Sequence, residues 1–295
     1  MRSLRTFIDG SADGENDQVE NSRFAILAVL RSLVVLGDQQ FRKWRCKDRI
    51  FALQNPIQKP KIHRVGVQTH LEERNLENLF GDRWQDVARF NRIDRRHVHP
   101  GISLKIPKSF DDIRDYTPMP RHYQAAESDV SESDAKRILV DLSEQFLGAY
   151  EYGQLMFSGP VAAGTKKNTT PVGEFRITGY SKMHKSSLYQ IEHTTEPYPM
   201  SYGLRFYINR EGGSYWIHGR DLPGYPASHG CIGLYDEEMQ HDYYKYPEKP
   251  MLEDARKLFA WAIPSPADRG GEYDVRTGPK VLIIDHEPRS GPRSR

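Results

Sequence analysis

Short segments in which apolar and polar side chains alternate fill the second half of the chain, a pattern typical of strands with one buried face. In the first segment Ile138 and Val140 share a face, and a turn at Tyr152-Gly153 leads into a returning antiparallel segment. Aromatic and β-branched segments follow, and then apolar residues at helical spacing. In chain order the segments are RILVDL, QLMFSGPVAAG, TTPVGEFRITGYS, LRFYINR, SYWIHG, the helical MLEDARKLFAWAI, and PKVLIIDHE. Residues 137–287 are therefore predicted to form a mainly β domain, a sandwich or barrel with one late helix.

Residues 62–108 carry a different pattern. HRVGVQ alternates like a short strand, LENLFGDRWQDVARFNRID has apolar residues at near-helical spacing, and a Pro-Gly turn leads into a second strand at 102–106. A helix, NRID, Pro-Gly and a strand ending in Ile-Pro resemble the second half of a LysM module, a small βααβ peptidoglycan-binding fold. The usual Gly-Asp-Thr start is missing. The segment is predicted to be a small α/β LysM-like module, and an α/β domain without glycan affinity is the alternative.

The flanking segments are less regular. Residues 109–136 hold prolines, serines and aspartates with little periodicity and are predicted to be a linker. Residues 1–61 are predicted to be a partly disordered N-terminal region, and the basic tail 288–295 a disordered end. Within the N-terminal region, the apolar run 24–37 has the length of a signal-peptide core but is interrupted by Arg31. It is interpreted either as an export signal or anchor, or as an amphipathic or buried helix.

Composition narrows the function classes. Lys and Arg number 42 against 40 for Asp and Glu, a formal charge of +2, so bulk charge gives no reason to expect a nucleic-acid partner. The two cysteines, Cys46 and Cys231, are too few for a disulfide framework. A single reactive thiol is the better interpretation of Cys231, because of the residues around it.

Cys231 lies in the stretch IHGRDLPGYPASHGCIG, behind two histidines, His218 and His229. A free thiol has a pKa of about 8.5, so it needs a nearby base to act as a nucleophile at neutral pH. If SYWIHG ends a strand and SHGC closes the loop after it, both imidazoles approach the sulfur. Gly230 lets the backbone come close to a substrate carbonyl, where an N–H stabilises an oxyanion. A zinc site of His218, His229 and Cys231 is the alternative, but it has no obvious fourth ligand.

Three separated motifs carry a resemblance to a known family. The HG…SHGC pattern, the hairpin RILVDLSEQFLGAYEYGQ and the turn TTPVGEF occur in the order seen in the L,D-transpeptidase catalytic (YkuD) domain. The resemblance covers residues 137–286, half of the chain. It implies acyl transfer on peptidoglycan tetrapeptide stems, with Cys231 as nucleophile and His218 as the histidine that activates it. Ser228, His229 and Gly230 match the rest of the signature and are implied to shape the site and its oxyanion hole.

The resemblance also implies the reaction and its partners. The thiolate attacks the carbonyl of the third stem residue and releases the terminal D-alanine, and an amine of an acceptor stem resolves the thioester into a 3→3 crosslink. Peptidoglycan stems and glycan are the implied partners, carbapenem-type β-lactams the implied inhibitors, and no cofactor or metal is required. The implied location is the cell envelope or periplasm, with the protein exported or membrane-tethered.

Substrate-binding candidates are Arg220, Tyr202 and Gly219, with Gly233 as the main departure from the family pattern. The family often has Asn or Arg two residues after the cysteine, where Gly233 stands here. Arg220 is the candidate to supply the missing positive charge, and a solvated loop residue is the alternative. Water as the acceptor would make the protein an L,D-carboxypeptidase. A non-catalytic cell-wall binding protein and a general cysteine peptidase are further alternatives.

Overall fold

The computed structural model describes residues 75–107, 110, 117–123, 135–191, 193–267 and 270–285, together with the backbone of residues 62–66. All of them belong to one compact unit, Asn55–Arg295. The predicted N-terminal region 1–61 with its apolar run 24–37, most of the linker 109–136, and the tail 288–295 lie outside the described residues. None of the helices described is long and apolar enough to span a lipid bilayer.

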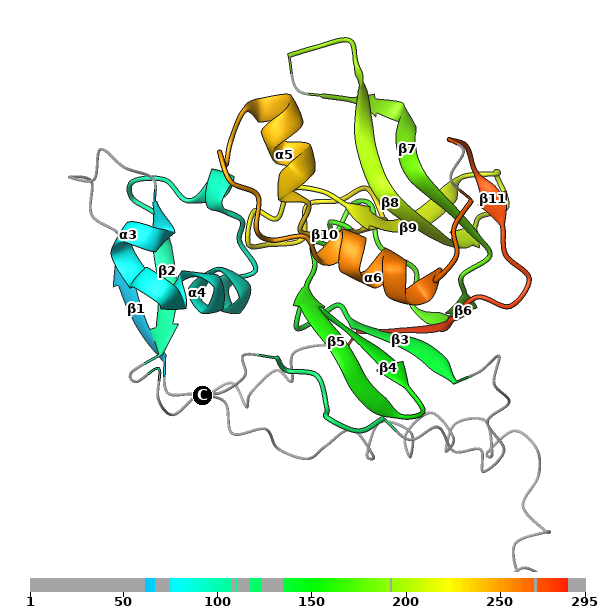
Figure 1. The fold of residues 1–295 in the computed structure, drawn as a ribbon, viewed down its shortest axis with the longest axis horizontal. Helices are drawn as coiled ribbons and strands as arrows, with labels where there is room; N and C mark the ends of the chain where they lie inside the picture. Colours follow the sequence, from blue (N-terminus) through cyan, green and yellow to red (C-terminus); the bar gives the residue numbers. More distant parts are fainter. Residues whose placement is uncertain are drawn as a thin grey trace, which may run out of the picture. The chain divides into compact units, whose positions relative to one another are not determined.

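Two five-stranded sheets form the larger part of the structure (Figure 1). The first has the order β5-β4-β3-β12-β6, and the second β10-β9-β8-β7-β11. The strands of the first sheet are β3 Lys136–Asp141, β4 Phe146–Glu151, β5 Gln154–Pro160, β6 Gly173–Arg176 and β12 Lys280–Ile284. Those of the second are β7 Gly179–Gln190, β8 Pro197–Ile208, β9 Ser214–Gly219, β10 Ile232–Leu234 and β11 Tyr273–Asp274. The predicted mainly β fold class is confirmed.

One helix fills the space between the sheets. Helix α6, Asp254–Ala262, carries the apolar spacing expected of the predicted late helix, and Leu258 and Phe259 lie in its buried face. These side chains join one hydrophobic core with Ile138 of β3 and Ile217 of β9, so the core takes residues from both sheets. Burial of such apolar side chains stabilises the fold by about 1.5–3 kcal/mol each.

The path of the chain between β9 and β10 positions the residues of the candidate site. It leaves β9 at Gly219, runs through residues 220–230, here called the site loop, and returns as β10 parallel to β9. Asp236 then caps helix α5, Glu237–Tyr244, by accepting a hydrogen bond from the N–H of Met239. Because β9 and β10 are parallel neighbours, residues separated by the whole site loop lie side by side.

The described residues of the segment 62–107, here called the small module, have the order strand, two helices, strand. Strand β1, Ile62–Gly66, pairs antiparallel with β2, Ser103–Pro107, and helices α3, Leu76–Phe80, and α4, Trp84–Asn91, lie between them in sequence. The single helical pattern expected here is broken at Gly81, whose φ of +50° is a conformation that glycine tolerates. The chain passes from α3 to α4 through one 3-10 turn, Gly81–Arg83.

The small module and the mainly β domain share hydrophobic packing. Val87 and Ala88 of α4 belong to one buried cluster with Leu222 of the site loop and Tyr235, which follows β10. Residues 117–123, from the predicted linker, also hydrogen bond to β5, where the Leu155 N–H donates to the Arg121 carbonyl at 3.0 Å. The two parts are therefore packed together in the region that the structure describes.

Candidate active site

The parallel pair β9–β10 brings the two halves of the predicted motif together. His218 stands near the end of β9, and its Cα partner across the ladder is Gly233, two residues after Cys231. Cys231 immediately precedes β10, and the backbone N–H of Trp216 donates a hydrogen bond to its sulfur. The thiol therefore lies beside the strand that carries the histidine, although twelve residues separate the two in sequence.

His218 is held as a neutral base. Its side chain is buried, with the residue 4% exposed, and Nδ1 lies 2.7 Å from the carbonyl oxygen of Gly219. Since a carbonyl only accepts, Nδ1 carries the proton and Nε2 keeps a free lone pair. Burial, and then the nearby Arg220 guanidinium, lower the pKa of His218 to about 3. At neutral pH the ring is therefore uncharged.

Cys231 is a partly exposed free thiol. Burial of the sulfur raises its pKa above the ordinary value, while the N–H of Trp216 and the charge of Arg220 act in the opposite direction. The resting group is therefore a thiol at neutral pH. Its activation requires a proton acceptor at the moment of attack, and His218 is the buried base of the adjacent strand.

A tight turn holds the cysteine in place. The Ser228 hydroxyl donates to the Cys231 carbonyl and accepts from the Gly230 N–H at 3.0 Å. Gly230 has a φ of +113°, and a Cβ there would lie 2.6 Å from Cε1 of Tyr215, so glycine is required on both counts. The Thr170 hydroxyl donates to the Gly230 carbonyl at 2.9 Å. Thr170 was not among the predicted site residues, although it belongs to the TTPVGEF motif, whose presence was the available signal.

Two predicted site residues contact other parts of the domain. His229 is exposed, and its ring stacks on Tyr189 of β7, with 4.1 Å between ring centroids. Tyr202 of β8 packs edge-on against Phe259 of α6, and its hydroxyl lies 3.4 Å from the Glu238 carboxylate. The structure thus places Cys231, His218, Gly219, Ser228, Gly230 and Arg220 in one neighbourhood, with the His229 ring turned toward β7 and Tyr202 toward α5 and α6.

Comparison with known protein families agrees with this arrangement. The sequence model of the L,D-transpeptidase catalytic domain, YkuD, matches residues 135–283. The chain belongs to this family. The match covers the two sheets, the site loop and α6, whereas the small module lies outside it, so the LysM-like interpretation of residues 62–108 is not supported by the comparison and stays a prediction.

Solved structures of L,D-transpeptidases are similar to parts of the chain. LdtMt1 in complex with imipenem is 14% identical, with a TM-score of 0.33 over 51% of this chain and 59% of that one. The enzyme from Xylanimonas cellulosilytica is 23% identical, with a TM-score of 0.32 over 51% and 61%. The Stackebrandtia nassauensis enzyme is 18% identical, with a TM-score of 0.36 over 71% and 69%. The chain thus spans about three fifths of the first two structures. No curated protein matches the chain.

In this YkuD domain the space above Gly233 is already occupied. A Cβ at position 233 would lie 1.9 Å from both Cγ and Cδ of Arg220, so the arginine side chain passes directly over the glycine. The Arg220 guanidinium is partly exposed, with Nε 3.2 Å from the Asp221 carbonyl and Nη2 3.4 Å from the Ala227 carbonyl. The lack of a side chain at 233 thus makes room for the arginine at 220.

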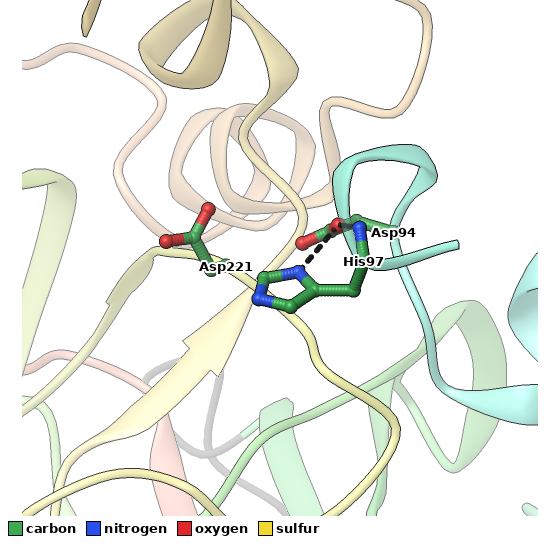
Figure 2. A group of neighbouring side chains, drawn as sticks. All are labelled: Asp94, His97 and Asp221. Atoms are coloured by element: carbon green, nitrogen blue, oxygen red, sulfur yellow. Dashed lines mark hydrogen bonds and ion pairs between the residues drawn. The ribbon is translucent and has the colours of Figure 1, made fainter. Parts of the chain in front are cut away.

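The site of the YkuD domain does not coincide with a metal-binding constellation. Among the described residues, the acidic and histidine side chains close enough to share an ion are Asp94, His97 and Asp221 (Figure 2), and His218, His229 and Cys231 do not form such a group. The carboxylates of Asp94 and Asp221 already accept hydrogen bonds from protein N–H groups, which leaves little coordinating capacity for a cation.

Proposed function

We propose that the protein is an L,D-transpeptidase that transfers peptidoglycan stem peptides through a thioester on Cys231. The observation that carries the proposal is the placement of Cys231 at the start of β10 beside the neutral, buried His218 of β9, within a domain of the YkuD family. A nucleophile next to a base that is itself oriented by a third group is the arrangement that covalent acyl transfer needs.

The proposed reaction has two halves. In the first, His218 Nε2 takes the thiol proton while the Cys231 sulfur attacks the carbonyl of the third residue of a tetrapeptide stem. The bond to the terminal D-alanine breaks, and the proton passes from His218 to the departing amine. In the second, an acceptor amine attacks the thioester, and the thiol is restored. The carbonyl of Gly219 fixes the histidine tautomer throughout.

The oxyanion of each tetrahedral intermediate is proposed to lie against backbone N–H groups of the turn that ends at Cys231. Ser228 holds this turn through its two hydrogen bonds, and Thr170 holds the Gly230 carbonyl from the other side. Donors fixed before the reaction begins stabilise developing charge without reorganising. No metal or organic cofactor enters this chemistry.

Arg220 is proposed to bind the donor stem through a carboxylate. Its side chain passes over Gly233, the ladder partner of His218, and so lies close to the reacting groups. Arginine matches a carboxylate with two parallel N–H donors. Replacement by alanine is expected to raise KM for a tetrapeptide donor, and an unchanged KM would remove this part of the proposal.

The nucleophile is tested by intact mass spectrometry. A carbapenem is expected to add its mass to the wild-type chain and not to Cys231→Ala, because ring opening acylates the thiol. An adduct that persists on Cys231→Ala would contradict the nucleophile assignment, and the lack of an adduct on wild type would contradict the proposed enzyme. The products formed from tetrapeptide muropeptides then tell crosslinked dimers from free tripeptides, which a carboxypeptidase would give.

We also propose the cell envelope as the place of action, since mature stem peptides are found there. The strand–helix–helix–strand order of residues 62–107 is compatible with a LysM-like module that binds glycan. Sedimentation of the full chain with purified peptidoglycan tests this: binding is expected for wild type and for Cys231→Ala alike, and an unbound protein would contradict it.

A further inference from the structure

The small module supplies hydrogen-bond partners to the site loop. The Asp94 N–H donates to the Leu222 carbonyl at 2.8 Å, and the Leu222 N–H donates back to Asp94 Oδ2 at 2.7 Å. Ile93 and Pro223 form an antiparallel bridge beside this pair. The middle of the site loop is thus paired, in the manner of a strand, with residues 93–97, here called the docking segment.

A buried network of side chains strengthens this pairing. Asp94 is 0% exposed, and its carboxylate also accepts from His97 Nδ1 and Gln240 Nε2, both at 2.7 Å. Gln240 Nε2 donates to Asp221 as well, at 2.8 Å, and Arg96 Nη2 reaches the other oxygen of Asp221 at 2.9 Å. Figure 2 shows Asp94 and His97 facing Asp221 across this contact. The docking segment, the site loop and α5 are therefore tied together at one point.

The docking segment is itself anchored to the mainly β domain. Arg95 donates from Nε to the buried Glu237 of α5 at 2.8 Å. The Tyr235 hydroxyl donates to the Ile93 carbonyl at 2.9 Å, and in the preceding helix α4 Arg89 makes two 2.6 Å hydrogen bonds with Asp254 of α6. Such paired, mostly buried contacts leave the segment little freedom to move without breaking charged hydrogen bonds.

The position of this contact along the chain links it to the reacting groups. Backbone hydrogen bonds hold both ends of the site loop. At the start, the Arg220 N–H donates to the Leu234 carbonyl at 2.9 Å, and at the end, the Ser228 N–H donates to the Ala163 carbonyl at 2.9 Å. Asp221 and Leu222, three and four residues after His218, take their partners mainly from the docking segment and Gln240. The loop segment that follows the base is thus held from two sides, by Asp94 and Arg96 outside the YkuD domain and by Gln240 within it.

From this arrangement we propose that Asp94 and Arg96 are positioning residues of the active site. They hold the site loop so that the His218–Gly219 end of β9 and the Arg220 side chain keep the geometry that acylation of Cys231 requires. The inference rests on the proposed transpeptidase function and adds to it a role for the small module. The module acts as part of the catalytic structure, in addition to any binding of glycan.

The test compares, in the full chain, Arg96 of the docking segment with Arg92, which immediately precedes that segment. Arg96→Gln removes the ion pair with Asp221. Arg92→Gln removes a longer ion pair, 3.5 Å from Nη2 to the Glu144 carboxylate, and a 3.0 Å hydrogen bond to the Glu144 carbonyl, far along the chain from the site loop. Arg96→Lys keeps the charge and is the conservative variant. For each protein one measures Tm, the rate of Cys231 acylation by a carbapenem, and hydrogen exchange of peptides covering residues 220–228.

The expected result separates positioning from general stability. Arg96→Gln should slow acylation about tenfold, because a displacement of about 1 Å in an active site can cost more than that. It should also speed exchange of residues 220–228, while Arg92→Gln leaves both unchanged at a comparable Tm. Arg96→Lys should recover most of the acylation rate. Equal acylation and equal exchange in Arg96→Gln and Arg92→Gln would overturn the inference.

A failure of the proposed function gives a different result. If wild type is not acylated at all, the transpeptidase assignment fails, and the exchange measurement alone decides whether the docking segment holds the loop. Asp94→Asn serves as a second variant, since it replaces an acceptor oxygen with an N–H group that opposes the Leu222 or His97 donors. Unchanged exchange of residues 220–228 in both variants would overturn the inference whatever the enzyme assay shows.

Discussion

The packing of Arg220 over Gly233 leads to a specific prediction for Gly233→Ala. The added methyl group would lie 1.9 Å from Cγ and Cδ of Arg220, far inside the separation of about 3.5–4.0 Å at which carbon atoms attract. The backbone at 233 is fixed by two 3.0 Å hydrogen bonds with Ala162, so the arginine side chain must be the part that moves. The substitution is therefore expected to expel the Arg220 guanidinium from the site.

The cost can be divided between stability and activity. The two hydrogen bonds that Arg220 gives up are 3.2 and 3.4 Å long and partly exposed, so the free energy of unfolding should fall by less than about 1 kcal/mol. If the guanidinium binds a donor carboxylate, a charged hydrogen bond of about 1.5–3 kcal/mol is lost. That corresponds to a fall in kcat/KM of roughly ten- to hundredfold.

A double-mutant cycle measures the coupling. Steady-state kinetics with a tetrapeptide donor are compared for wild type, Gly233→Ala, Arg220→Ala and the double variant. Because the arginine is already absent in Arg220→Ala, adding the methyl group at 233 to that variant should change its kcat/KM little. Additive effects of the two substitutions, or a Gly233→Ala enzyme with unchanged kcat/KM, would refute the proposed packing relation.

Three further substitutions test the support of the site. Gly219→Ala should destabilise the fold by about 1–3 kcal/mol, because its Cβ would lie 2.1 Å from Oδ2 and 2.7 Å from Cβ of the helix cap Asp236. Thermal melting measures this effect, and an unchanged Tm would contradict the close packing. Ser228→Ala should cost about 1–3 kcal/mol in a denaturant titration, since the Gly230 N–H and the Cys231 carbonyl lose their partner. Burial, and then Asp236, raise the pKa of Glu253 to about 8, so the folded state keeps a proton that the unfolded chain releases above about pH 4.5. The free energy of unfolding should then fall between pH 5 and 8 by up to about 1.4 kcal/mol per pH unit, and Tm should fall with it. Glu253→Gln should show a weaker fall of Tm over this range. Curves of Tm against pH that run parallel for wild type and Glu253→Gln would contradict the assigned role of Glu253.

Much of the mainly β domain could be predicted from local patterns. Alternation identified β3, the Tyr-Gly pair identified the turn before β5, and aromatic and β-branched residues identified β9. The 3.6-residue period identified α6. Among the elements that were not anticipated are β10 and α5. The strand β10 is three residues long, too short for a period to show, and α5 reads EEMQHDYY, whose apolar residues form no clear stripe. Their places are decided by pairing with β9 and by contacts with α6 and the small module.

The sequence by itself determined the chemistry available to this protein: a lone cysteine in a loop of glycines and histidines, and three motifs in the order of one family. Only the tertiary structure shows the different surroundings of the two histidines: the parallel pairing of β9 with β10 places His218 opposite Gly233, two residues from Cys231, while the ring of His229 stacks on Tyr189. It also decided the meaning of Gly233, whose empty side-chain space is filled by Arg220. Such contacts join residues distant along the chain, and no local pattern records them.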